Sequence, residues 1–160
     1  MIADLDELVT AAVTGLFSTM LHMQMAPVPV EPSVVNGEPH VAGAVGFIGR
    51  LTGVVYVHTT AAFARRLTAT LLHLDDSKVQ AEEMINDAMG EIANMLVGQI
   101  KSRLSDGGIR CVLTIPSVVR GSQFRIEATS STEGRLFAFE TQGKRIFVQF
   151  LFQPSGQTQN

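Results

Sequence analysis

The sequence predicts an α+β fold, a two-layer sandwich in which helices, one of them long, pack on a mostly antiparallel sheet. Apolar residues recur at helical spacing over residues 2–21 and again in a long stretch that ends near residue 104, with strand-like segments between and after them. The 160 residues are 46% hydrophobic, which is enough to bury one core without disulfides or a metal. We therefore expect a single domain over residues 1–153 and a flexible polar tail at 154–160.

Charge and cysteine content exclude several classes of protein. The formal net charge is −3, so the chain lacks the basic balance that nucleic-acid binders normally show. Cys111 is the one cysteine, which excludes a disulfide framework and fits a reducing cytoplasm. We interpret Cys111 as a core residue of a strand. No glycine-rich phosphate-binding motif is present, so a nucleotide cofactor is not expected.

The first predicted helix carries no charge from residue 8 onward, which raises the question of a membrane segment. Residues 8–30 contain threonines, a serine, a histidine and a glutamine and end in a proline-rich segment, so they do not qualify as a span. Asp4, Asp6 and Glu7 precede the stretch where a signal peptide would carry basic residues. We expect no membrane insertion and a cytoplasmic location. The prolines predict an extended connector after the helix.

A hairpin and a second helix are predicted next. Residues 41–49 and 54–58 have the composition of strands, and residues 50–53 form the turn between them. Glycine within a strand marks a place where another backbone approaches closely, and the first of these strands contains several. Thr60 is a candidate N-cap for the second helix, whose apolar stripe is Ala64, Leu67, Leu71 and Leu74.

The third helix is predicted to be the longest element. Ser77 and Gln80 have the spacing of a capping box, which predicts a helix from Ser77 to about Leu104, ending near Gly107. Strand signals follow at 110–115, 117–119, 123–130, 135–141 and 145–152. The last two of these segments are apolar on both faces, so each is either central in the sheet or part of an interface.

A helical wheel of the long helix separates a broad apolar sector from one polar stripe, which consists of Asp87, Glu91, Asn94, Gly98 and Lys101. One interpretation is a solvated helix face. Asparagine and glycine are poor helix formers, however, and Gly98 leaves a notch that another protein's backbone could approach. The alternative interpretation is therefore a docking surface.

Glu91 and Asn94 lie three positions apart, so their side chains are neighbours on the helix. A carboxylate beside a carboxamide can bind a cation and orient a water, but cannot by itself form a covalent intermediate. The metal and the electrophile would have to come from a partner. Glu83 and Asn86 have the same spacing, but Asn86 lies well to the side of the stripe, so the wheel favours Glu91 and Asn94.

The segment from Asp87 through Glu91 and Asn94 to Gly98 resembles the phosphatase helix of the CheC/CheX/FliY family. The family pattern is D/S-x-x-x-E-x-x-N with a proline a little over twenty residues later, and here Pro116 follows Asn94 after twenty-one residues. Residues 45–49 and 52–57 also resemble the glycine-punctuated hairpin of CheX-like proteins. The resemblance covers roughly residues 2–152, and the single motif copy suits CheX better than CheC, which carries two.

This resemblance implies a CheC/CheX-like fold and an enzyme, a phosphatase of the aspartyl phosphate on a CheY-type receiver. Glu91 would pair with the receiver's conserved lysine, and Asn94 would position water for in-line attack. Asp87, Gly98 and Lys101 would belong to the partner-binding surface. Mg²⁺ would reside in the receiver, so the chain would hold no metal or cofactor of its own.

The resemblance also implies a homodimer joined through the sheets. The alternative function is a non-catalytic receiver-binding adaptor, or a structural subunit like the related motor-switch proteins. The histidines do not alter this assignment, because they have no metal-ligand spacing and are interpreted as structural or exposed: His22, His40, His58 and His73. Nothing in the sequence indicates the roomy apolar pocket of a small-molecule-binding domain.

Overall fold

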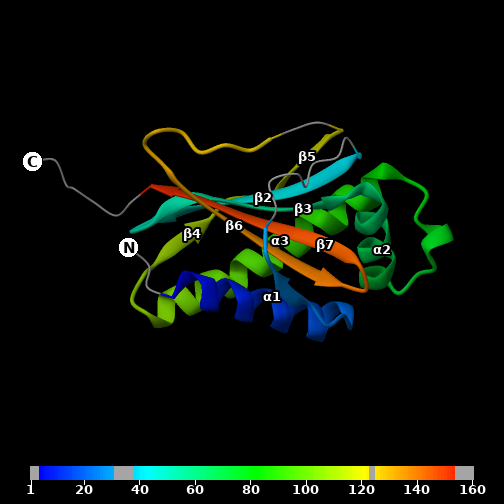
Figure 1. Ribbon diagram of the computed structural model, residues 1–160, viewed down its shortest axis with the longest axis horizontal. Coiled ribbons are helices and arrows are strands. Elements are labelled where there is room, and N and C mark those ends of the chain that lie inside the picture. The colour runs from blue at the N-terminus through cyan, green and yellow to red at the C-terminus, as the bar shows by residue number, and fades with distance from the viewer. Residues whose placement is uncertain (1–3, 31–37, 123–124, 154–160) are drawn as a thin grey trace, which may run out of the picture.

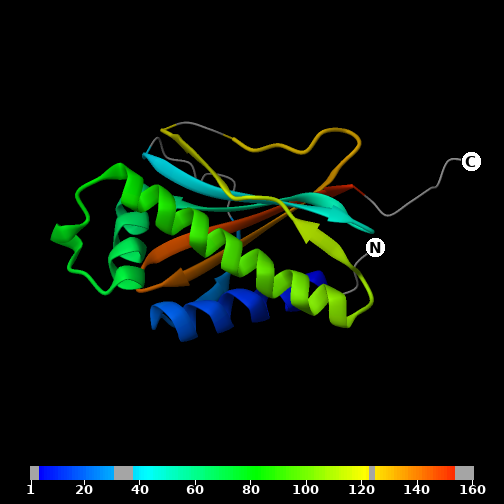
Figure 2. The same cartoon turned by 180° about the vertical axis from the view of Figure 1, so that it is seen from behind.

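The computed structural model describes residues 4–30, 38–122 and 125–153, and its architecture confirms the predicted α+β sandwich (Figure 1). Helices α1 (Leu5–Leu21) and α3 (Glu82–Asp106) lie along one face of an antiparallel sheet, and α2 (Ala61–Leu72) lies near one end of α3. Figure 2 shows the same layers from behind, with α3 crossing the sheet diagonally. The 154–160 tail falls outside the described residues.

The sheet contains seven strands in the order β1-β6-β7-β3-β2-β4, with β5 also paired to β2. Their bounds are β1 Ala26–Val28, β2 His40–Gly49, β3 Thr52–Thr60, β4 Cys111–Leu113, β5 Ser117–Gly121, β6 Glu133–Thr141 and β7 Lys144–Gln153. Alternate residues enter the core under the helices, as Val55 and Val57 do on β3. Of the last two strands, β7 is central, because it lies between β6 and β3 and buries Phe150 and Phe152, whereas β1 pairs with β6 only over residues 138–140.

The predicted strand at 123–130 is wrong in the part that the structure describes. Residues 125–129 belong to a segment that crosses the outer face of the sheet, opposite the helices (Figure 1). The Gln149 side chain donates a hydrogen bond to the Ile126 carbonyl at 2.7 Å, so a side chain satisfies this backbone group where a neighbouring strand would otherwise do so. The apolar and polar residues alternate as in a strand, but no strand among the described residues pairs with 125–129.

The predicted start of the long helix is also wrong. Asp76–Lys78 forms a short 3₁₀ turn, and α3 begins at Glu82. Val79 is fully buried between the two elements, which pulls the chain into the core before the helix can start. The Gln80 side chain donates to the Ser77 carbonyl at 3.3 Å instead of closing a capping box. The Thr60 cap of α2 is confirmed, since its hydroxyl accepts a hydrogen bond from the Phe63 amide at 3.2 Å.

The proline-rich connector contains β1, which lies at the edge of the sheet and pairs with β6. Pro27 is tolerated there because an edge strand does not need all of its amide donors. Among the described residues, no helix is both long and apolar enough to cross a bilayer.

The position of α3 depends on a close approach to β2. A Cβ added to Gly43 would lie 2.6 Å from the Met89 carbonyl oxygen and 2.9 Å from the Ala93 Cβ. Only glycine allows the strand and the helix to lie this close together. The strand glycine at residue 43 therefore marks a backbone contact, as predicted, and it lies directly beneath the segment of α3 that carries Glu91 and Asn94.

Candidate functional site

The ridge of α3 carries the predicted stripe on the side away from the sheet. Buried residues on the opposite side hold the helix in the core, among them Met89, Ile92 and Leu96. Asp87 and Glu91 are exposed, and Asn94 is half-buried. The helical period therefore places a carboxylate and a carboxamide side by side at the surface, with a rigid core behind them.

The side chains of Glu91 and Asn94 have no hydrogen-bond or ion-pair partner within the described ranges. Their polar atoms are thus available to a molecule that approaches α3 from solvent. A carboxylate offers acceptors only, whereas a carboxamide offers both donors and an acceptor. Together they can engage a cationic group and hold a water at the same time.

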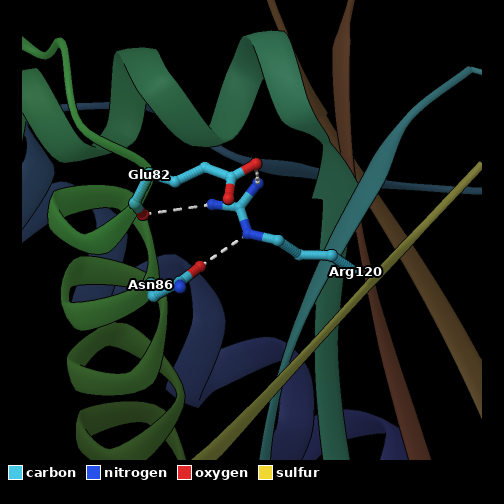
Figure 3. A network of polar contacts seen from close by, with 3 residues as sticks. All are labelled: Glu82, Asn86 and Arg120. Atoms are coloured by element: carbon cyan, nitrogen blue, oxygen red, sulfur yellow. Dashed lines mark hydrogen bonds and ion pairs between the residues drawn. The ribbon is translucent and has the colours of Figure 1, made fainter.

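The competing pair, Glu83 and Asn86, is arranged differently. Figure 3 shows that Asn86 points toward Arg120 of β5, whose Nε donates to the Asn86 Oδ1 at 2.6 Å. The Arg120 guanidinium also donates to the Glu82 carbonyl at 3.2 Å and forms an ion pair with the Glu82 carboxylate at 3.6 Å. Asn86 is therefore occupied inside the molecule, which distinguishes it from Asn94.

A glycine lies one turn after each asparagine, Gly90 after Asn86 and Gly98 after Asn94. The presence of a glycine therefore does not distinguish the two pairs, but the surroundings of the two glycines do. A Cβ on Gly90 would contact the Pro116 side chain at 3.7 Å, so that side of α3 is packed against the chain leading into β5. A Cβ on Gly98 would meet nothing within 4 Å. The notch predicted at Gly98 is open, and the one at Gly90 is filled.

Gly98 borders a groove of about 430 Å³ between α3 and the antiparallel α1. Small side chains and Gly15 line the α1 side of the groove, Met20 and Met95 lie at its walls, and Arg103 lies on its α3 side. Gly15, like Gly98, has open space where a Cβ would be. The surface is therefore hollowed beside the ridge, and this hollow was not apparent from the sequence.

Lys101 lies on the other flank of the stripe. It borders the contact between α3 and β4 together with Cys111 and Leu113. Burial raises the pKa of the Cys111 thiol, and the charge of Lys101 opposes this rise. Cys111 is buried in β4, which agrees with its interpretation as a core strand residue. The stripe thus divides at its C-terminal end, with Gly98 toward α1 and Lys101 toward β4.

The histidines lie away from the α3 ridge. His22 and His73 are exposed and adopt positive φ at the C-termini of α1 and α2. The rings of His40 and His58 lie 6.5 Å apart on neighbouring strands, and His58 stacks on Phe147. Over residues 4–30, 38–122 and 125–153, no group of three His, Cys, Asp or Glu side chains is placed to hold a metal ion.

Comparison with known proteins identifies the family. The family model for the chemotaxis phosphatase CheX matches residues 41–140. A chemotaxis protein CheX from Desulfovibrio desulfuricans is 26% identical over 94% of this chain and 100% of its own, with a TM-score of 0.77. A CheC-like superfamily protein from a Shewanella species is 22% identical, with 96% and 100% coverage and a TM-score of 0.80.

A further solved structure is the CheX–CheY–BeF₃–Mg²⁺ complex from Borrelia burgdorferi. One of its chains is 21% identical, with 93% and 97% coverage and a TM-score of 0.73. The comparison with curated proteins finds no match. The family model spans well over half of the sequence and includes the α3 ridge, and the fold agrees with it, so this chain belongs to the CheX family of chemotaxis phosphatases.

Proposed function

We propose that this protein hydrolyses the aspartyl phosphate of a CheY-type receiver by docking the α3 ridge into the receiver's phosphorylated cleft. The observation that carries the proposal is the contrast between the two glutamate–asparagine pairs. Glu91 and Asn94 are presented to solvent without partners among the described residues, whereas Asn86 is bound to Arg120. A CheX–CheY complex among the structural relatives supports a receiver as the partner.

In this proposal Asn94 is the catalytic residue. Its carboxamide accepts and donates hydrogen bonds, so it can hold one water in line with the phosphorus–oxygen bond that breaks. Phosphoryl transfer requires mainly positioning and charge neutralisation, with little covalent chemistry from the protein. A carboxamide without an adjacent base is therefore sufficient, provided that the receiver supplies the charge neutralisation.

Glu91 anchors the docked receiver by pairing with its conserved lysine. A charge-assisted contact of this type is worth roughly 1.5–3 kcal/mol. Asp87 extends the ridge toward the N-terminus of α3, and Gly98 and Lys101 extend it toward the C-terminus. The notch at Gly98 opens into the groove beside α1, so receiver backbone can approach α3 closely at that point. The Mg²⁺ belongs to the receiver.

We also propose a homodimer joined through the edge of the sheet. The phenylalanines of β6 and β7 are largely buried within the chain, so few of them are exposed to a second copy. The better candidate is the edge of the sheet at β4, which pairs with β2. There Ile48 and Val112 are opposite each other in the register and are 60% and 69% exposed. Edge strands with exposed apolar side chains are suited to pairing with another chain.

The proposed activity is tested with a phosphorylated CheY-type receiver, Mg²⁺ and purified protein, by following the loss of phosphate. The wild-type protein is expected to accelerate the loss, and Asn94→Ala is expected to abolish the acceleration while it retains binding. Glu83→Ala is the matched control, because Glu83 is an exposed carboxylate on the same helix that lies two turns before Glu91 and one turn before Asp87, where the ridge begins. Its activity should equal that of the wild type.

The alternative function is a non-catalytic adaptor that binds the receiver through the same ridge. It predicts saturable binding with an unchanged rate of phosphate loss. If the wild-type protein accelerates phosphate loss and Asn94→Ala does so equally, the catalytic role assigned to Asn94 is wrong.

A further inference from the structure

We propose that Arg120 and Asn86 are positioning residues, which set the roll of α3 about its axis and thereby aim Asn94 and Glu91 at the receiver. This inference rests on the proposed function of the ridge. Figure 3 shows the contact on which it depends, between the side chains of Arg120 on β5 and Asn86 on α3.

Arg120 forms hydrogen bonds with two successive turns of α3. Arg120 donates to the Asn86 side chain at 2.6 Å and to the Glu82 carbonyl, one turn earlier, at 3.2 Å. Its side chain is only 25% exposed, whereas that of Glu82 is 75% exposed. The short bond to Asn86 is therefore the ordered part of the cluster, because an exposed ion pair at 3.6 Å contributes little.

The same flank of α3 continues into an apolar contact. Glu82, Asn86 and Gly90 follow one another at intervals of one turn and form a column on the helix. Gly90 faces Pro116 and Val118, and a Cβ placed on it would lie 3.7 Å and 4.0 Å from their side chains. Pro116, which directly precedes β5, and Val118 and Arg120 within β5 occupy alternate positions of the chain. The helix column and the strand column therefore face each other.

The contacts of Arg120 with Asn86 and Glu82 attach this flank of α3 to the sheet, and we call them the polar tether. Within residues 4–30, 38–122 and 125–153, Arg120 is the only strand residue that is joined to α3 by a side-chain hydrogen bond or ion pair. The opposite flank borders the groove of about 430 Å³ beside α1 and is less completely filled. The contact at Gly43 lies beneath the helix, where it fixes the height of α3 above β2 more directly than its rotation.

The required precision makes the tether relevant to catalysis. Side-chain tips lie about 5–6 Å from a helix axis, so a roll of about 10° displaces the Asn94 carboxamide by about 1 Å. A misplacement of about 1 Å can lower a rate by about 100-fold. Loss of the bond at Asn86 is thus expected to impair the chemical step, even though Asn86 does not touch the receiver.

The test measures kcat and KM for phosphate loss over a range of phosphorylated receiver concentrations. Arg120→Met removes the donors and keeps much of the side-chain volume, and Asn86→Ala removes the acceptor. Each is expected to lower kcat by about 10-fold or more and to change KM by less than about threefold. Asn86→Asp retains an acceptor for the arginine and should restore most of kcat. The double variant should be no worse than the poorer single variant.

Arg125→Met is the matched control, since Arg125 forms an exposed ion pair with Glu127 remote from α3. It should behave as wild type. Thermal unfolding of every variant separates positioning from folding, and if Arg120→Met does not fold, Asn86→Ala decides the question alone. Unchanged kcat, a change confined to KM or to the melting temperature, or failure of Asn86→Asp to recover kcat would overturn the inference.

The proposed function fails separately from this inference. If wild-type protein does not accelerate phosphate loss, the proposed function fails and the positioning role falls with it. If wild-type protein is active and Asn94→Ala is not, while Asn86→Ala retains full kcat, only the positioning role is wrong.

Discussion

The contact between α3 and β2 predicts opposite effects of one substitution at two glycines. In Gly43→Ala the new Cβ would lie 2.6 Å from the Met89 carbonyl oxygen, whereas ordinary contacts begin at 3.4 Å. The helix and the strand must therefore separate by about 0.8 Å. The opposing atom belongs to the helix backbone, which cannot rotate away as a side-chain tip can. In Gly98→Ala the new Cβ meets nothing within 4 Å.

The expected magnitudes follow from these distances. Overpacking costs about 1–3 kcal/mol, and alanine regains about 0.5–1 kcal/mol over glycine in a strand, so Gly43→Ala should lose about 1–2 kcal/mol. For a chain of this size the melting temperature should fall by about 2–8 °C. Gly98→Ala should gain up to about 1 kcal/mol from helix propensity and melt about 2–4 °C higher.

Thermal and urea unfolding of the two variants and the wild type measure both effects. The reasoning about the close approach would be refuted if Gly43→Ala were as stable as wild-type protein with an unchanged dependence on urea. Gly98→Ala also carries a functional prediction. It should bind the phosphorylated receiver more weakly than wild-type protein although it is more stable, because the methyl group fills the notch.

Three further predictions concern the ridge, the dimer and a half-buried histidine. Glu91→Ala should weaken receiver binding by about 10- to 100-fold in a titration, whereas Glu83→Ala should not. Light scattering at micromolar concentration should give twice the monomer mass, and Val112→Glu should give a monomer; a wild-type monomer would contradict the dimer. Burial, and secondarily the charge of His40, lowers the pKa of His58 from 6.5 to about 4. The unfolded chain then binds a proton that the folded protein excludes, so stability is complete above pH 6.5 and declines as the pH falls toward 4. His58→Gln should reduce the difference in urea midpoint between pH 7 and pH 4.5, and an unchanged difference would show that other groups cause it.

Local periodicity was sufficient to predict the ridge of α3. The side-chain directions of a helix follow from its geometry, so the exposed positions of Asp87 and Glu91 could be predicted without knowledge of the rest of the fold. The close approach at Gly43 was also predictable, because a glycine inside an apolar strand has few other uses. Both features depend on residues near each other in the chain or on a single residue.

The features that the sequence did not reveal depend on distant contacts. The bond between Arg120 and Asn86 joins residues 34 positions apart, and a lone arginine in a strand has no local signature of its partner. The groove beside Gly98 requires the relative placement of α1 and α3. The false capping box at Ser77 shows the same limitation, since burial of Val79 overrides a local signal that is worth only about 1 kcal/mol.

The arrangement of α3 separates the residues that support the helix from those that are free to act. Gly43 lies beneath it, and Arg120 and Pro116 lie along one flank. Glu91 and Asn94 are on the ridge, and their side chains form no hydrogen bond or ion pair within the described residues. Asparagine in a helix interior also costs stability relative to alanine. Substitutions beneath the helix should therefore lower both stability and activity. Asn94→Ala should remove activity while it preserves or raises the melting temperature, and a clear loss of stability in that variant would mean that Asn94 serves the fold rather than the receiver.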